Sequence, residues 1–132
     1  MNDFFETFSP HVLYYVEKRC TSEWRLPSNP INFYDLTYVY EGSATYLING
    51  TSYKLKKGDF VFIKAGSIRE AFVNESEFMS CFAFNFLINS EPNAINLPPC
   101  FHIDNDHELI YLYKQFTTAW LDKPYGYMLK TR

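Results

Sequence analysis

The chain has 132 residues, of which 47% are hydrophobic and 20% are aromatic. That length suits one domain with a single core, and that composition excludes a disordered tail. The formal net charge is -3 and no run of Lys or Arg exceeds two residues, which excludes a surface built for nucleic acid in this chain.

The cysteines and the amino terminus bear on the compartment. Cys20, Cys81 and Cys100 are odd in number and follow no zinc-binding spacing. The first residues, MNDFFETFSP, lack the basic and long apolar regions of a signal peptide, and no apolar run approaches the roughly 18 residues of a membrane span. We therefore expect a reduced, cytoplasmic protein with no membrane contact.

The amino-terminal half is predicted to form strands. Residues 12–19 combine β-branched and aromatic side chains without a helical period, and residues 33–41 alternate between two faces. Between them, SEWRLPSNPIN (22–32) holds two prolines and an Asn-Pro step. Those residues predict a loop that crosses the end of a barrel.

A β-hairpin is predicted at Asn49-Gly50, because a type I′ turn needs two residues with positive φ and Asn-Gly accepts that conformation. The turn fixes the register of the two strands and pairs Tyr46 with Tyr53. Five side chains then share one face of the hairpin: Ala44, Tyr46, Ile48, Tyr53 and Leu55.

Two apolar strands are predicted to follow. DFVFI (59–63) is apolar on both faces, as expected for a strand between two packed layers. The strand in FMSCFAFNF (78–86) gathers Phe78, Phe82, Phe84 and Phe86 on one side and leaves Cys81 on the other.

The pattern then changes to a helical period. Asn105 and Glu108 resemble a capping box, and a stripe of large apolar side chains follows. The sequence predicts a helix over residues 106–121, ended by DKPYG, and the first turn of a second helix in YMLKTR. The sequence ends before this second helix could bury an apolar face, as expected of a fragment excised from a longer protein. The stripe consists of Leu109, Leu112, Phe116 and Trp120.

The run YVYEGSATYLINGTSYKLKKGDFVFIKAGSIRE (38–70) resembles the cupin barrel, specifically the amino-terminal sensor domain of AraC-type bacterial transcription regulators. The order of Glu41-Gly42, Asn49-Gly50, Gly58-Asp59 and Gly66 carries the resemblance, together with the FNF strand, Leu97-Pro98 and the helix ending in Trp120.

The resemblance covers residues 10–132 and implies a mainly β fold. Residues 1–104 would form a cupin-like antiparallel β-barrel, a double-stranded β-helix or jelly roll, with a short N-terminal arm. Residues 105–132 would form a helical linker that dimerises the protein through the stripe. In that family a second long helix and two helix-turn-helix units follow. DNA would then be bound only through that part, which this sequence lacks.

Metal-dependent cupins supply a His-x-His pair and a Glu before the hairpin, and another His at the end of the strand after Gly-Asp. Here His11, His102 and His107 lie outside those positions, and Asp35 is the only carboxylate near the Glu position. Arg69 occupies the last position, and arginine stays protonated. We therefore expect a barrel without a metal or another cofactor, which excludes most cupin enzymes.

The candidate ligand-binding residues each have two interpretations. Arg69 is either a surface arginine paired with Glu70 or another carboxylate, or a guanidinium at the barrel mouth that suits a sugar's hydroxyls or a carboxylate. Arg25 is either a solvated loop residue or the pocket arginine that the resemblance implies. Tyr46 and Tyr53, which point inward, either line a pocket or pack the core. Cys81 either faces that pocket or is an inert buried thiol, which is the default for a buried cysteine. The candidate set is Arg25, Asp35, Tyr46, Tyr53, Arg69 and Cys81.

The sequence therefore predicts a sensing and dimerising domain, not an enzyme, that binds a small-molecule effector. The resemblance and the aromatic content favour a carbohydrate effector. The alternative is a small metal-independent cupin enzyme such as a sugar isomerase or epimerase, which needs a convergent acid/base pair. The candidates for that pair are Asp35, Glu41 and Glu70. A packed, ligandless structural barrel is the third possibility.

Overall fold

The structure, a computed structural model, describes residues 10–88 and 97–103 together with His107, Tyr111 and Lys114. Within these residues the chain forms eight strands, and all their pairings are antiparallel. In chain order they are β1 (Pro10–Cys20), β2 (Arg25–Pro30), β3 (Tyr34–Ile48), β4 (Thr51–Lys56), β5 (Asp59–Ile63), β6 (Ile68–Phe72), β7 (Met79–Ile88) and β8 (Cys100–His102).

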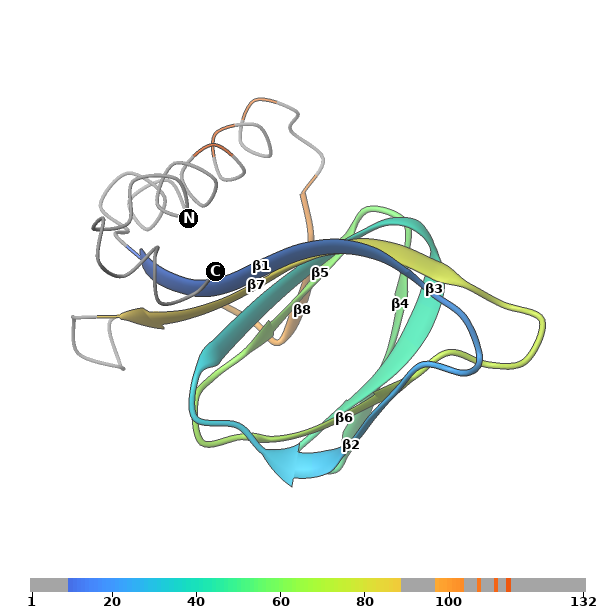
Figure 1. Cartoon of the computed structure of the whole chain (residues 1–132), viewed down its shortest axis with the longest axis horizontal. Helices are drawn as coiled ribbons and strands as arrows, with labels where there is room; N and C mark the ends of the chain where they lie inside the picture. Colours follow the sequence, from blue (N-terminus) through green and yellow to red (C-terminus); the bar gives the residue numbers. More distant parts are fainter. Residues whose placement is uncertain (1–9, 89–96, 104–106, 108–110, 112–113, 115–132) are drawn as a thin grey trace.

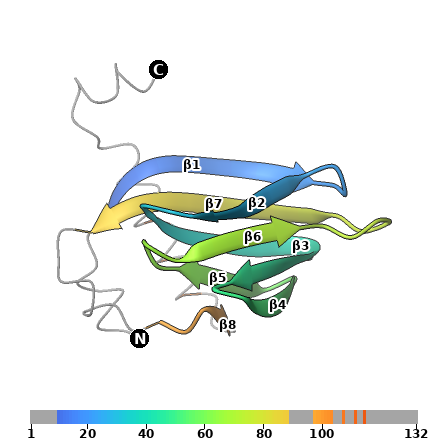
Figure 2. The ribbon, with the colours of Figure 1, turned by 90° about the horizontal axis from the view of Figure 1, so that it is seen from below.

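The long strand β3 belongs to both layers of the barrel. Its first half pairs with β7 and β5, which gives a layer in the order β1-β7-β3-β5-β8. Its second half pairs with β4 and β6, and β6 pairs with β2. In Figure 1 the strands enclose a common interior, with β2 and β6 across from β1 and β7. Figure 2 shows the same strands from below, with β1 and β8 at opposite margins of the strands.

Two apolar cores lie on the two faces of the first layer. The inner cluster fills the space between the layers, because residues of both layers belong to it. It consists of Cys20, Ile31, Val39, Ala44, Tyr46, Ile48, Leu55, Val61, Ile63, Ala71, Val73, Met79 and Cys81. The outer cluster lies on the other face and consists of Val12, Tyr34, Leu36, Phe60, Phe62, Phe84, Phe86, Leu97 and Ile103.

Strand β5 confirms the prediction for a strand between two packed layers. All five of its residues are buried. Phe60 and Phe62 belong to the outer cluster, whereas Val61 and Ile63 belong to the inner one. Period-2 alternation thus gives each face of this strand its own core.

The hairpin prediction is also confirmed. The register pairs Tyr46 with Tyr53 and Ala44 with Leu55, and Asn49 and Gly50 both have positive φ. All five side chains predicted to share a face belong to, or pack against, the inner cluster.

The prediction of a loop over residues 22–32 is wrong. Residues Arg25–Pro30 form β2, which among the described strands pairs with β6 and no other. A proline is tolerated on an edge strand because no neighbouring strand needs its missing N–H as a hydrogen-bond donor. The pairing of β2 with β6 also shifts register between Leu26 and Asn29, around Pro27. The prolines therefore mark an edge strand with an irregularity.

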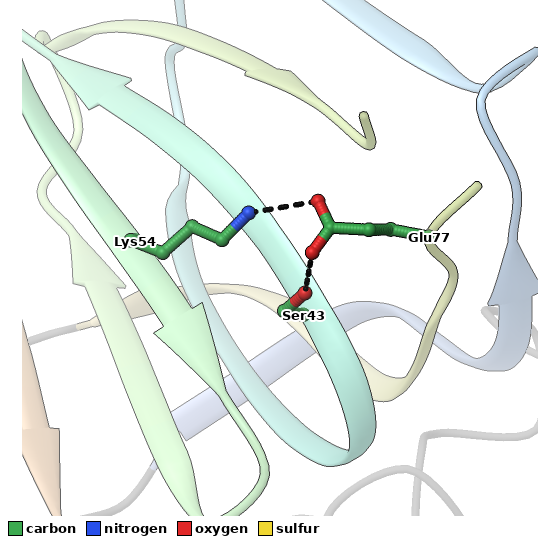
Figure 3. Close-up of polar contacts among 3 residues, drawn as sticks. All are labelled: Ser43, Lys54 and Glu77. Carbon is green, nitrogen blue, oxygen red and sulfur yellow. Dashed lines mark hydrogen bonds and ion pairs between the residues drawn. The ribbon is translucent and has the colours of Figure 1, made fainter. Parts of the chain in front are cut away.

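Figure 3 shows how the connection between β6 and β7 is attached to the hairpin. The Glu77 carboxylate accepts hydrogen bonds from Lys54 Nζ on one oxygen and from Ser43 Oγ on the other, both at 2.9 Å. Lys54, then Ser43 and Asn74, hold the pKa of Glu77 below its usual value. Because the pKa is lowered, this contribution to stability is present above the unfolded pKa and is lost as the pH falls through the folded one.

The predicted carboxy-terminal helix falls mostly outside the described residues. Of the segment 106–121 the structure describes His107, Tyr111 and Lys114, and the stripe residues Leu109, Leu112, Phe116 and Trp120 lie outside the description. That helix and its role in dimerisation therefore stay predictions. Among the residues that are described, no helix is long and apolar enough to cross a membrane.

Candidate functional site

A buried ion pair joins the two layers of the barrel at one end. Asp35 lies near the start of β3, and its side chain is 3% exposed. Its Oδ2 accepts a hydrogen bond from Arg69 Nη1 of β6 at 2.7 Å, and its Oδ1 accepts one from Thr37 Oγ1 at 2.8 Å. Both carboxylate oxygens thus have donors, as a buried charge requires.

Tyr46 extends this polar group into the interior. Tyr46 is 2% exposed, and Asp35, Arg69 and Thr37 all influence the pKa of its hydroxyl. Burial first, and then the nearby charge of Asp35, raise the pKa of Tyr46 well above its ordinary value. Arg69, Asp35, Thr37 and Tyr46 therefore form one polar line through an otherwise apolar core.

The raised pKa of Tyr46 predicts a loss of stability at alkaline pH. The unfolded state ionises Tyr46 above about pH 10 while the folded state keeps the proton, so stability is full below that pH and falls above it. The slope for one proton is about 1.4 kcal/mol per pH unit. Urea unfolding between pH 9 and 11 should show a shallower decline for Tyr46→Phe than for the wild type. Parallel declines in the two proteins would contradict the prediction.

An open depression of about 410 Å³ lies beside Arg69. Its size is within the range of small-molecule sites. The Arg69 guanidinium carbon lies 5.3 Å from the centroid of the Phe33 ring, which is also in the lining. The depression is lined by Leu26, Pro27, Asn29, Pro30, Ile31, Asn32, Phe33 and Arg69. It thus combines apolar walls with two amides and a paired guanidinium.

The structure brings some of the sequence-predicted residues together. Asp35, Arg69 and Tyr46 belong to the polar line, and Tyr53 lies opposite Tyr46 in the hairpin. The partner of Arg69 is Asp35, 34 residues away, so the guanidinium is fixed by a carboxylate near the start of β3.

Arg25 lies apart from this group. It pairs with Phe72 in the register of β2 and β6, and Phe72 and Arg69 are three residues apart on one strand, so their side chains point to opposite faces. Arg25 Nη2 donates to Glu70 Oε2 at 2.8 Å, and its side chain is 63% exposed. The structure therefore places Arg25 on the outer surface, in the ion pair of a solvated residue.

Cys81 faces the barrel interior, on the side of β7 opposite to the phenylalanines. It belongs to the inner cluster, while Phe82, Phe84 and Phe86 belong to or pack against the outer one. Phe78 precedes β7 and lies under the guanidinium of Arg19, 3.8 Å from its ring centroid. The hydrogen bond with Cys20, and then burial, raise the pKa of Cys81.

Several interior residues were missed by the sequence reasoning. Lys18 of β1 pairs with Cys81, so it faces inward, and its Nζ lies 5.1 Å from the centroid of the Trp24 ring. Trp24 is in turn 6.4 Å from Tyr46, centroid to centroid. Period-2 alternation back from Cys20 could have indicated Lys18, whereas the predicted loop concealed Trp24 and the walls of the depression.

No three His, Cys, Asp or Glu side chains converge as a metal site in the part of the chain that the structure describes. His102 Nδ1 lies 3.1 Å from Asp59 Oδ1, with β8 paired to β5 around it. The metal-free barrel stays a prediction, and elemental analysis of the purified protein tests it.

Comparison with known proteins gives a family and a fold. Residues 11–71 match the model of the AraC-like ligand binding domain family. A search of curated proteins gives no match.

Solved structures with a similar fold include two that are named as cupins. A predicted oxalate decarboxylase from Thermotoga maritima has a TM-score of 0.54 and 14% identity, over 59% of this chain and 69% of its own. A cupin 2 conserved barrel domain protein from Salinispora arenicola has a TM-score of 0.52 and 14% identity, over 63% and 68%. An RmlC-like cupin family protein with a double-stranded β-helix fold from Methanocaldococcus jannaschii has a TM-score of 0.52 and 14% identity, over 66% and 78%.

At such identities the likeness shows the fold alone, and one of these proteins is described as an enzyme, so the fold does not separate sensors from enzymes. The predicted cupin-like barrel is confirmed. The described strands thus build a cupin barrel, and residues 11–71 within it are similar to the AraC-like ligand binding domain family.

Proposed function

We propose that this chain is the effector-sensing domain of an AraC-type transcription regulator, and that a sugar or sugar derivative binds in the depression beside Arg69. The family match supports a sensing role. The observation that carries the site is the Arg69 guanidinium, which is held by Asp35 at 2.7 Å while it also lines an open depression of about 410 Å³.

The residues that line the depression favour a ligand that has many hydroxyl groups and carries no charge where it contacts Arg69. Asp35 already compensates the charge of Arg69, so a ligand carboxylate here would compete with Asp35 for the same cation. Remaining guanidinium N–H groups and the amides of Asn29 and Asn32 suit hydroxyl groups. Phe33 offers an apolar face to the C–H side of a sugar ring.

The enzymatic alternative requires two titratable groups that act on one substrate. Asp35 is held by Arg69 and Thr37. Glu70 is held by Arg25 on the outer surface, and the exposed Glu41 lies 3.8 Å from Arg19. The three carboxylates considered for an isomerase or epimerase therefore do not converge, which supports a binding role over a catalytic one.

The binding proposal predicts that some member of a carbohydrate panel raises the melting temperature, since a ligand of the folded state stabilises it. Asn32→Ala should weaken that ligand by about 3- to 10-fold in calorimetry, the contribution of one ordinary hydrogen bond. Ser52→Ala, an exposed change on the hairpin, is the matched control. No stabilising sugar in the panel, or equal affinity for the wild type and Asn32→Ala, would count against this site.

We also infer that the chain works as a homodimer through the stripe of Leu109, Leu112, Phe116 and Trp120, and that DNA is bound only by helix-turn-helix units elsewhere in the full protein. The support is the apolar helical period together with the family match. Sedimentation over a range of concentrations tests the dimer, and Phe116→Asp should shift it to monomer. An unchanged distribution of the variant would contradict the dimer.

A further inference from the structure

Two free thiols lie next to each other inside the barrel. Cys20 of β1 and Cys81 of β7 are 2% and 0% exposed, and neither is in a disulfide. The register pairs Cys20 with Met79 and Lys18 with Cys81, so the two cysteines are diagonal neighbours on the same face of adjacent antiparallel strands. Each thiol is also the largest influence on the pKa of the other.

The two thiols differ in their surroundings. Cys20 is the last residue of β1, whose partner among the described strands is β7, and the exposed residues Thr21 and Ser22 follow it. Such a strand end opens locally at a much smaller free energy than the whole barrel. Cys81 lies in β7, between β1 and β3. The interaction with Cys81 lowers the pKa of Cys20, burial raises it, and the charge of Lys18 adds a smaller lowering, so that the net direction is down, whereas the pKa of Cys81 is raised.

We propose that Cys20 and Cys81 form an oxidation site, at which a peroxide converts the two thiols into a disulfide that links β1 to β7. Cys20 is the attacking thiol, because it is the last residue of β1, where local opening exposes it to the peroxide. Cys81 is the resolving thiol. This inference is independent of the sugar proposal.

The two steps balance in atoms and electrons. The Cys20 thiolate attacks one oxygen of hydrogen peroxide, the O–O bond breaks, and the departing hydroxide takes a proton to become water, which leaves a sulfenic acid on Cys20. The Cys81 sulfur then attacks the Cys20 sulfur, the S–O bond breaks, and a second water leaves. Two thiols are oxidised and one peroxide is reduced to two waters.

The bond would enclose residues 20–81, a segment that contains β2 to β6 and the whole depression beside Arg69. A closed loop of this length restricts the unfolded chain strongly, so the oxidised protein should melt roughly 5 to 15 °C higher than the reduced protein. The effector site would then lie in a barrel whose first and last long strands are covalently joined.

The test treats the native protein with one to a few equivalents of hydrogen peroxide and follows mass, free thiols and melting temperature. We expect the loss of two hydrogens, a fall in free thiols from three to one, a linked Cys20–Cys81 peptide and a higher melting temperature, all reversed by dithiothreitol. Cys100→Ser is the matched control and should oxidise in the same way.

The single variants separate the roles of the two thiols. Cys81→Ala should accumulate a sulfenic acid on Cys20 that dimedone traps, and Cys20→Ala should form neither product. A disulfide that involves Cys100, dimedone labelling of Cys81, or oxidation of Cys20 and Cys81 only after the protein is unfolded in urea would each overturn the proposal. If Cys20→Ala or Cys81→Ala does not fold, the results for the wild type and Cys100→Ser still decide whether the Cys20–Cys81 disulfide forms.

Discussion

Replacing Gly42 by alanine should lower the free energy of unfolding by about 3 kcal/mol or more, the sum of a left-handed conformation and an overpacked contact. Gly42 has φ +79°, and a Cβ there would lie 1.9 Å from the Phe78 carbonyl oxygen and 2.8 Å from its carbon. Those are backbone atoms, so no side-chain rotation relieves the clash. The same carbonyl accepts a hydrogen bond from Ser43 N at 2.8 Å, and Met79 begins β7 immediately after it.

The damage would fall at the point where β3 passes from one layer to the other, because the pairing with β7 shifts register between Val39 and Glu41 and ends at Gly42. Gly50→Ala is the matched control. Its φ is +86° but a Cβ there meets nothing within 4 Å, so it should lose only about 1 to 2 kcal/mol from backbone strain. Urea unfolding measures both variants, and equal losses would show that the Phe78 contact is relieved without cost.

Local features of the chain were readable from the sequence. The hairpin register follows from two residues, Asn49 and Gly50, whose preference for positive φ holds in almost any context. The burial of β5 follows from its composition. Strand β2 was not readable, because Pro27 and Pro30 argue against a strand only where a partner needs their N–H groups. Whether a strand is an edge strand depends on the tertiary arrangement.

The residues of the candidate site also fall into those that the local sequence predicts and those that it does not. The hairpin register alone turns Tyr46 inward, as the structure confirms. The pairing of Asp35 with Arg69 spans 34 residues and needs the two layers to face each other, which no local pattern specifies. Arg25 and Arg69 look equivalent in the sequence, yet alternation along β2 and β6 sends them to opposite faces.

The pair of Asp35 and Arg69 should therefore behave as a buried ion pair. Arg69→Met keeps an unbranched, apolar stem and leaves Asp35, 3% exposed, without its cation, so the free energy of unfolding should fall by about 3 to 5 kcal/mol. Arg25→Met breaks the pair with Glu70, in which the arginine is 63% exposed, and should change stability by about 0 to 1 kcal/mol. Both changes are arginine to methionine in the same pair of strands, so the contrast isolates burial.

A double-mutant cycle measures the interaction energy between Asp35 and Arg69 directly. Asp35→Asn removes the buried negative charge, so Arg69→Met made in that background should be at least about 2 kcal/mol less damaging than in the wild type. Urea unfolding at pH 7 of the four proteins gives the coupling energy. Additive losses would mean that Arg69 does not neutralise Asp35 in solution, and its guanidinium would then be free to bind a ligand carboxylate. A large coupling would keep the guanidinium fixed by Asp35 at the edge of the depression, where it is limited to hydrogen bonds with uncharged groups.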